Sequence, residues 1–287
     1  MANVLAIDQG TSGTKALVIN GSDEVIGLAE RVITPRYEKN GAVEQDPWQM
    51  LASVKDAARE AMDQAGVEID VVTLTNQGET VLAWDFLSGR PLTDMIVWQD
   101  RRAESVCERL KAHKDLVAQK TGLVLDPYST ATKMTWLREN LTKEGVVTTS
   151  DTWLLRQLTG EFVTDISTAS RSLILNIDTG KWDEELLKLF GLQDEKMPRI
   201  VESNVLIGKT TAFGGEIPVG GLIVDQQAAL LAQNCLQQGE VKCTFGTGAF
   251  MLANVGEKAV RSTAGLALSV AWAANGTRTY CFDVQVY

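Results

Sequence analysis

Histidine is nearly absent from this chain, since His113 is the single histidine among 287 residues. A metal site or a catalytic site that needs several imidazoles cannot be built from one, so we expect neither histidine-based catalysis nor a histidine-rich metal site. The four cysteines contain no CxxC pair, and their spacing suits no zinc site. We therefore expect reduced thiols and a cytoplasmic protein.

Long apolar runs and an excess of positive charge are also lacking. No apolar run approaches the length of a membrane span, so we expect no membrane partner. The net charge of −10 argues against general binding to nucleic acid or to a membrane surface. A local nest of backbone N–H groups can still hold an anion in an acidic protein. The first residues enter an apolar run at once, which predicts no signal peptide.

The first polar turn is the element around which we expect a site to form. Two short runs of branched residues, 4–7 and 16–19, are typical of strands. The turn between them begins at Asp8 and holds two glycines, three hydroxyls and Lys15. Such a turn suits a phosphate, and a carboxylate beside a phosphate indicates a bridging Mg²⁺. An ordinary hairpin with a polar turn is the alternative.

Strands and helices alternate along the chain that follows. The expected strands are residues 25–29, 31–34, 71–75, 81–85, 95–98 and 217–224. The expected helices are residues 47–65, 103–119, 133–140, 151–158, 182–190 and 228–235. We interpret residues 37–45 as a loop and 198–207 as a connector. The alternation favours an α/β sandwich with a mixed sheet, in which a ligand lies at the carboxyl ends of strands.

A second hairpin repeats the pattern of the first. The buried run that ends at residue 224 is followed by Asp225. Residues 241–245 then enter a Gly/Thr turn at 246–248, and residues 249–253 leave it. The same order of strand, turn and strand occurs in both places. We therefore expect two similar halves that face one ligand, with a repeat in pattern only.

The last strands of the chain lack a cover. Residues 266–274 and 279–287 are typical of strands two and three of the second half, and no helix follows them. Three strands cannot bury both faces of a sheet alone. We therefore expect the second domain to be truncated.

Several ordered motifs together resemble one family. The chain is similar to glycerol kinases, which are FGGY carbohydrate kinases, at 8–12 (DQGTS), 75–80 (TNQGET), 96–102 (IVWQDRR), 225–230 (DQQAAL) and 244–248 (TFGTG). Residues 128–140 also fit the family's first signature. The resemblance implies an α/β protein with the ribonuclease H-like fold of sugar kinases, actin and the Hsp70 ATPase. Residues 1–232 would be a complete first domain that binds polyol, and 233–287 the truncated start of a similar nucleotide-binding domain.

The resemblance implies an ATP-dependent kinase that phosphorylates a hydroxyl of a small polyol, most like glycerol. A hydroxyl is a poor nucleophile, so a carboxylate must take its proton. Asp225 matches the catalytic aspartate of the family, and Asp8 matches the aspartate near Mg²⁺. The positions that match the ATP phosphate side are Thr11, Ser12, Thr14, Lys15, Gly246, Thr247 and Gly248.

Polyol recognition needs partners for vicinal hydroxyls and an aromatic face for the C–H side. By family match, the residues expected to bind substrate are Gly78, Glu79, Trp98, Tyr128, Asp225, Gln226 and Phe250. Core packing is the alternative for the two aromatics Trp98 and Phe250. Gly78 departs from the family, because glycerol kinases usually carry arginine there. The loss of this donor frees volume, so erythritol, a pentitol or a ketopentose is an alternative substrate.

Two other classes of protein stay open at this stage. The chain could hold a polyol without catalysis, because most of the adenine side is expected to be missing. A plain ATPase of the actin or Hsp70 type is a third hypothesis, but it has no need of Glu79, Trp98 and Tyr128. The expected partners are a polyol and ATP, without nucleic acid or membrane. Whether the chain forms a homo-oligomer is left open.

Overall fold

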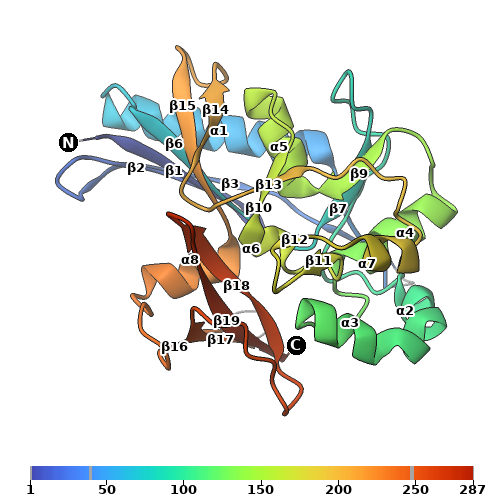
Figure 1. Ribbon diagram of the computed structural model, residues 1–287. Helices are drawn as coiled ribbons and strands as arrows, with labels where there is room; N and C mark the ends of the chain where they lie inside the picture. The colour runs from blue at the N-terminus through green and yellow to red at the C-terminus, as the bar shows by residue number, and fades with distance from the viewer. Residues whose placement is uncertain (1, 39–40, 246–248, 287) are drawn as a thin grey trace.

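A six-stranded mixed sheet is the centre of the first part of the chain. The computed structural model describes residues 2–38, 41–245 and 249–286 (Figure 1). β1 pairs antiparallel with β2 and parallel with β6, which is parallel to β15. This is the ribonuclease H-like arrangement that the motifs implied. The spatial order is β14 (Leu206–Thr210), β15 (Ile217–Val224), β6 (Val71–Asn76), β1 (Val4–Gln9), β2 (Gly13–Ile19) and β3 (Val25–Val32).

Helix α1 (Pro47–Ala65) packs on this sheet. It begins where the sequence predicts, because the side chain of Asp46 accepts a hydrogen bond from the backbone N–H of Trp48. It ends at Gly66, whose φ is 62°. The helix approaches β3 so closely that a Cβ on Gly27 would lie 2.1 Å from the backbone oxygen of Ala61. Glycine at position 27 is therefore a packing requirement.

A second, smaller sheet extends the first part. Its spatial order is β4 (Arg36–Tyr37), β5 (Val43–Gln45), β8 (Met95–Ile96), β7 (Val81–Trp84) and β9 (Val146–Thr149). The prediction of a loop over residues 37–45 is therefore wrong at both ends. β5 is buried despite its polar surroundings, and the backbone N–H of Val43 donates to Asp100 Oδ2 at 2.7 Å. Pairing with distant β8 stabilises this strand, which local composition does not reveal.

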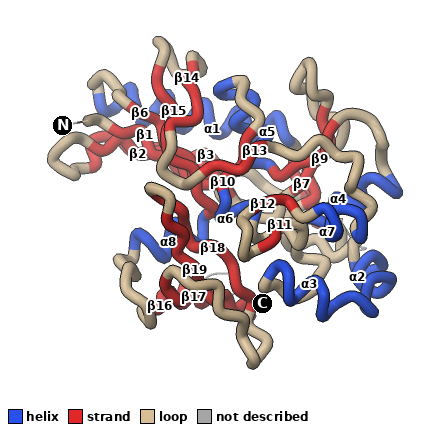
Figure 2. Tube along the Cα trace, in the orientation of Figure 1, coloured by secondary structure: helices blue, strands red, loops and turns tan. Residues whose placement is uncertain are grey.

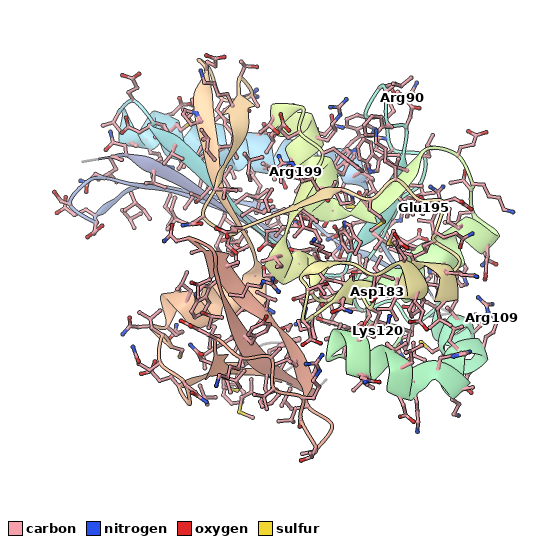
Figure 3. All side chains as sticks on the ribbon, viewed as in Figure 1. Arg90, Arg109, Lys120, Asp183, Glu195 and Arg199 are labelled. Carbon is pink, nitrogen blue, oxygen red and sulfur yellow. The ribbon has the colours of Figure 1, made fainter. Side chains whose placement is uncertain are left out.

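The helices near the second sheet are α2 (Glu104–Leu110), α3 (Lys114–Thr121), α4 (Thr130–Asn140), α5 (Ser150–Thr159) and α7 (Glu184–Leu189). The single helix expected at 103–119 is wrong, because a 3₁₀ turn, Lys111–His113, separates α2 from α3. All three residues of that turn are exposed, so no buried apolar side chain holds a continuous helix there. Figure 3 shows Lys120 and Asp183 close together, and their side chains pair at 2.9 Å.

Short elements complete this part of the chain. They are β10 (Val163–Asp165), α6 (Ile166–Ala169), β11 (Leu175–Asn176), β12 (Lys181–Trp182), β13 (Arg199–Val201) and α8 (Asp225–Ala232). The connector expected at 198–207 therefore contains a strand, because β13 pairs in parallel with the distant β10. Within the described ranges, no helix is both long enough and apolar enough to cross a membrane.

The end of the chain forms a four-stranded sheet beneath the first part in the view of Figures 1 and 2. The strands are confirmed, but β19 rather than β18 lies beside β17, unlike the β1–β2–β3 meander. Asn275 and Gly276, with φ of 54° and 82°, form the tight turn between β18 and β19. Leu268 of β18 packs with Ile166 of α6, so the two parts share a core. The spatial order is β16 (Val241–Phe245), β17 (Ala249–Gly256), β19 (Thr277–Val286) and β18 (Ala267–Ala274).

Candidate active site

Three strand ends meet at one edge of the six-stranded sheet. β1, β6 and β15 run parallel, so their carboxyl ends lie on the same side. Asp8 lies near the end of β1, Glu79 follows β6, and Asp225 follows β15. The hydroxyl of Thr75 on β6 donates to Asp8 Oδ1 at 2.7 Å. The topology thus gathers side chains that are far apart in the sequence.

A polar cavity of about 120 Å³ lies at this edge. At ~30 Å³ for each water molecule, the volume equals about four waters, which is the scale of a small polyol. The structure brings together every residue that we expected to bind substrate, and adds Thr11 and Arg171. A larger cavity of about 470 Å³ adjoins it through shared lining residues. The lining of the smaller cavity is Thr11, Gly78, Glu79, Trp98, Tyr128, Arg171, Asp225, Gln226 and Phe250.

Three aromatic rings form one side of the cavity. Trp98 packs edge-on against Tyr128 and Phe250, with ring centroids 5.7 and 5.8 Å away. Its indole N–H donates to Thr11 Oγ1 at 2.8 Å, and that hydroxyl donates to Gln77 Oε1 at 2.9 Å. Trp98 and Phe250 therefore line the cavity, rather than filling the interior. An apolar wall of this kind suits the C–H face of a polyol.

Asp225 carries the most informative titration behaviour of the cavity. Burial raises the pKa of Asp225 to about 7, and the charges of Glu79 and Asp8 add to the effect. The backbone N–H of Gln226 donates to Asp225 Oδ1 at 2.6 Å and acts in the opposite direction. A carboxylate with a pKa near the working pH is well suited to accept a proton as a general base.

Glu79 is held in an unusual backbone conformation at the bottom of the cavity. It is 3% exposed, and its φ of 54° lies in the left-handed region that residues with a Cβ rarely adopt. Burial raises its pKa, while the ion pair with Arg171 lowers it. Strained residues of this kind concentrate at functional sites, where the surrounding structure enforces the geometry.

The residues expected at the phosphates divide into four groups. Ser12 and Lys15 are exposed near Asp8, and Lys15 lies directly opposite Asp8 in the β1–β2 register. Thr11 instead lines the polyol-sized cavity. The prediction for Thr14 does not fit, because its side chain is fully buried and its hydroxyl bonds to Ser53 Oγ at 2.7 Å. Strand alternation turns Thr14 into the core, away from the face that carries Lys15. Gly246, Thr247 and Gly248 lie outside the described residues.

The oxygen ligand that Asp8 offers suits a hard cation whose other ligands come from water and substrate. Asp8 is exposed, and its charge reaches Asp225. The described residues include no cluster of three or more His, Cys, Asp or Glu side chains that could hold a metal ion by themselves. Mg²⁺ is usually bound by one or two carboxylates, water and substrate phosphates, so this donor set suits it.

Two buried lysines that sequence reasoning missed support the cavity. Lys133 is fully buried and donates to the backbone oxygens of Pro127, Tyr128 and Ser129. Burial lowers its pKa to about 8. Lys242 of β16 donates to Gln226 Oε1 at 2.6 Å and to Thr244 Oγ1 at 2.9 Å. Lys133 lies within the motif at 128–140, and a lysine on an otherwise buried helix face was a usable signal.

Arg171 and Asp283 were also missed. Both side chains are buried, and Arg171 Nη1 donates to Asp283 Oδ2 at 2.5 Å. Arg171 follows the hydroxyl-rich stretch 165–170, but nothing in that stretch shows that it reaches the cavity. Asp283 lies on β19, so only the docking of the second sheet brings it here.

A family model described as "FGGY family of carbohydrate kinases, N-terminal domain" matches residues 3–232. The chain belongs to the FGGY family of carbohydrate kinases. Among curated relatives, glycerol kinase of Thermus brockianus is 42% identical, and the match covers 100% of this chain and 61% of the relative. Glycerol kinase of Bdellovibrio bacteriovorus is also 42% identical, over 98% of this chain and 60% of the relative.

Solved structures of FGGY kinases share the fold. A crystal structure of Plasmodium falciparum glycerol kinase with ADP matches with a TM-score of 0.94 and 31% identity, over 99% of this chain and 61% of that chain. A ligand-bound xylulose kinase from Lactobacillus acidophilus matches with a TM-score of 0.90 at 19% identity, which shows the shared fold alone. The chain therefore spans about 60% of the length of these relatives. The family resemblance and the ribonuclease H-like fold are confirmed.

Proposed function

We propose that this FGGY chain is part of an ATP-dependent kinase that phosphorylates a hydroxyl of a small polyol, most like glycerol. The observation that carries the proposal is Asp225, a carboxylate with a pKa of about 7 on the wall of a cavity of polyol size. The glycerol kinases at 42% identity support the same substrate class. Acceptors such as Glu79, together with the aromatic wall, suit a compact molecule with vicinal hydroxyls.

Asp225 is the base in this proposal. The reacting hydroxyl gives its proton to the Asp225 carboxylate while its oxygen forms a bond to the γ-phosphorus of ATP. The bond from that phosphorus to the bridging oxygen breaks, and ADP leaves. Glu79 and Gln226 hold the remaining hydroxyls, and Trp98 excludes water from the C–H side.

Asp8, Ser12 and Lys15 form the phosphate side in this proposal. Lys15 and the hydroxyl of Ser12 are exposed toward solvent near Asp8, where an anion can reach them. Asp8 is the carboxylate proposed to hold Mg²⁺, which would neutralise charge on the phosphates. Gly246, Thr247 and Gly248 remain the proposed contacts from the second hairpin. The four cysteines carry free thiols, which supports a cytoplasmic location.

A longer polyol or a ketopentose is the second candidate substrate. The adjoining cavity of about 470 Å³ favours it, because Glu79, Tyr128 and Arg171 line both spaces. A non-catalytic polyol-binding domain is the corresponding hypothesis for the chain in isolation.

The test is a phosphorylation assay on the complete natural protein that contains this chain. ADP release is measured with ATP and Mg²⁺ against glycerol, erythritol, xylitol and xylulose. We expect turnover with at least one of these compounds and glycerol among the better ones. Polyol binding without ADP release from any compound would refute the kinase assignment and leave the binding-domain hypothesis standing.

A further inference from the structure

Arg171 occupies the centre of the wall between the two cavities. It is 5% exposed and lines both the smaller and the larger space. Its Nε donates to Glu79 Oε1, its Nη1 to Asp283 Oδ2 and its Nη2 to the hydroxyl of Tyr128 at 3.2 Å. A guanidinium has more N–H groups than these contacts use, so donor capacity remains within the described surroundings for an oxygen of a ligand.

Gly78 and Arg171 are neighbours in the wall of the smaller cavity. A Cβ on Gly78 would lie 3.8 Å from Arg171 Nε and 4.0 Å from Arg171 Cδ. These are ordinary contact distances, so the Arg171 side chain packs beside the backbone of residue 78 and does not itself require a glycine there. Arg171 thus brings a hydrogen-bond donor to the cavity wall, although it lies outside the sequence motifs that supply the other lining residues.

The segment that ends at Arg171 is hydrogen-bonded to two strands, β15 and β18. The hydroxyl of Ser167 accepts the backbone N–H of Val224, the residue before Asp225, at 3.0 Å. The hydroxyl of Ser170 accepts the backbone N–H of Val270 on β18 at 2.9 Å. The segment around α6 is thus bound to the strand that carries the proposed base and to the second sheet. Arg171 is held in one position by its neighbours along the chain as well as by its two carboxylates.

We propose that Arg171 is a specificity-determining residue of the polyol cavity, and that its anchor Asp283 makes polyol binding depend on the seating of the second sheet. The proposal rests on the proposed polyol kinase function. Arg171 donates a hydrogen bond to one particular oxygen of the substrate. The carboxylates of Glu79, Asp225 and Asp283 lie near Arg171. Because these negative charges repel an anion, the cavity takes a neutral polyol in preference to an anionic sugar.

The test identifies the hydroxyl of glycerol to which Arg171 donates a hydrogen bond. Binding of glycerol, propane-1,2-diol and propane-1,3-diol is measured by calorimetry on the unmodified protein and on Arg171→Met. Loss of a hydrogen bond to a charged group is expected to weaken binding by about 10- to 100-fold. We expect the unmodified protein to bind one of the two diols more weakly than glycerol by this factor, which we call the penalty for that diol. Arg171→Met should bind glycerol more weakly, with that penalty abolished and the other unchanged.

Controls separate recognition from folding. Arg138→Met removes a largely buried arginine that pairs with Glu195, and it should leave both penalties intact because neither residue lines either cavity. If Arg171→Met does not fold, Arg171→Lys keeps the charge without the planar fork, and Asp283→Asn removes only the anchor. Each should weaken polyol binding about 10-fold with ATP binding unchanged.

The outcomes distinguish this proposal from the one on which it rests. An equal penalty for both diols in the unmodified protein and in its Arg171 variants overturns the role of Arg171 and leaves the kinase proposal intact. Failure of the unmodified protein to bind any polyol overturns the proposed function, and the role of Arg171 with it. Weaker polyol binding in Arg138→Met, to the same extent, would show that loss of any buried arginine has this effect.

Discussion

Asp225 lies within electrostatic reach of Asp8, although Asp8 lies near the end of β1 and Asp225 follows β15. Burial is the main reason that the pKa of Asp225 rises to about 7, and the negative charges of Glu79 and Asp8 raise it further. The β6 strand between them sets this separation, because β1 and β15 both pair with it in parallel. The sheet therefore places Asp225, the proposed base, close enough to Asp8, the proposed metal ligand, for the charge of Asp8 to raise the pKa of Asp225.

The first prediction concerns pH. The base must be ionised, so kcat/KM for the polyol should rise with pH and level off above about 7, with the slope of one proton. Asp8→Asn removes one of the charges that raise the pKa of Asp225. A carboxyl carbon NMR titration of that variant should place the pKa of Asp225 lower than in the unmodified protein. An unchanged titration would contradict the coupling.

The second prediction is that Asp225→Asn separates catalysis from stability. Turnover should fall by about 10²- to 10⁴-fold while polyol binding persists. The pKa of Asp225 is higher in the folded state than in the unfolded state, so the protonated carboxyl favours the folded state. This contribution to the free energy of unfolding is present at low pH and is lost as the pH rises through about 7. The variant should therefore melt a few degrees higher than the parent at pH 8. A lower melting temperature at pH 8 would show that the carboxylate stabilises the fold.

The third prediction uses Gly78. A Cβ there would meet Val224 Cγ2 at 2.9 Å, immediately before Asp225 in the chain. Gly78→Ala should therefore displace Val224 and lower kcat/KM about 10-fold. Val224→Ala in the same chain removes the clashing methyl and should recover part of that loss. The double-mutant cycle should give a coupling energy of about 0.5–3 kcal/mol, and strict additivity would exclude the contact.

The fourth prediction assigns a positioning role to Lys133. Its ammonium holds the backbone oxygens of residues 127–129, so Lys133→Met should loosen Tyr128 and raise KM for the polyol about 10-fold. The KM for ATP should stay within about 2-fold, because that side of the site is untouched. Lys120→Met is the matched control, since it removes a lysine that pairs with Asp183, and neither residue lines the cavity. Equal changes in the two KM values would indicate a general loss of structure.

Much of the site could be predicted because its residues occur in local patterns. Asp225 follows a buried strand, Glu79 follows another, and Trp98 ends a short apolar run. Each pattern depends only on neighbours in the sequence, and strand ends carry ligands in sheets of this type. Thr14 shows where the same reasoning fails. It lies in the predicted turn motif, but the alternation of β2 turns its hydroxyl toward Ser53 in the core.

The amino-acid sequence by itself determined the family, the order of most strands and helices, and most of the residues that line the small cavity, but not Arg171. The helices and strands follow from local periodicity, and the family and its site residues follow from the resemblance of short motifs to known kinases. Only the tertiary structure decided that Arg171 lies between Glu79 and Asp283, that β19 pairs with β17, and that Lys133 is buried beneath Tyr128. Such contacts arise when segments far apart in the chain pack together, and burial then selects partners that no local pattern encodes.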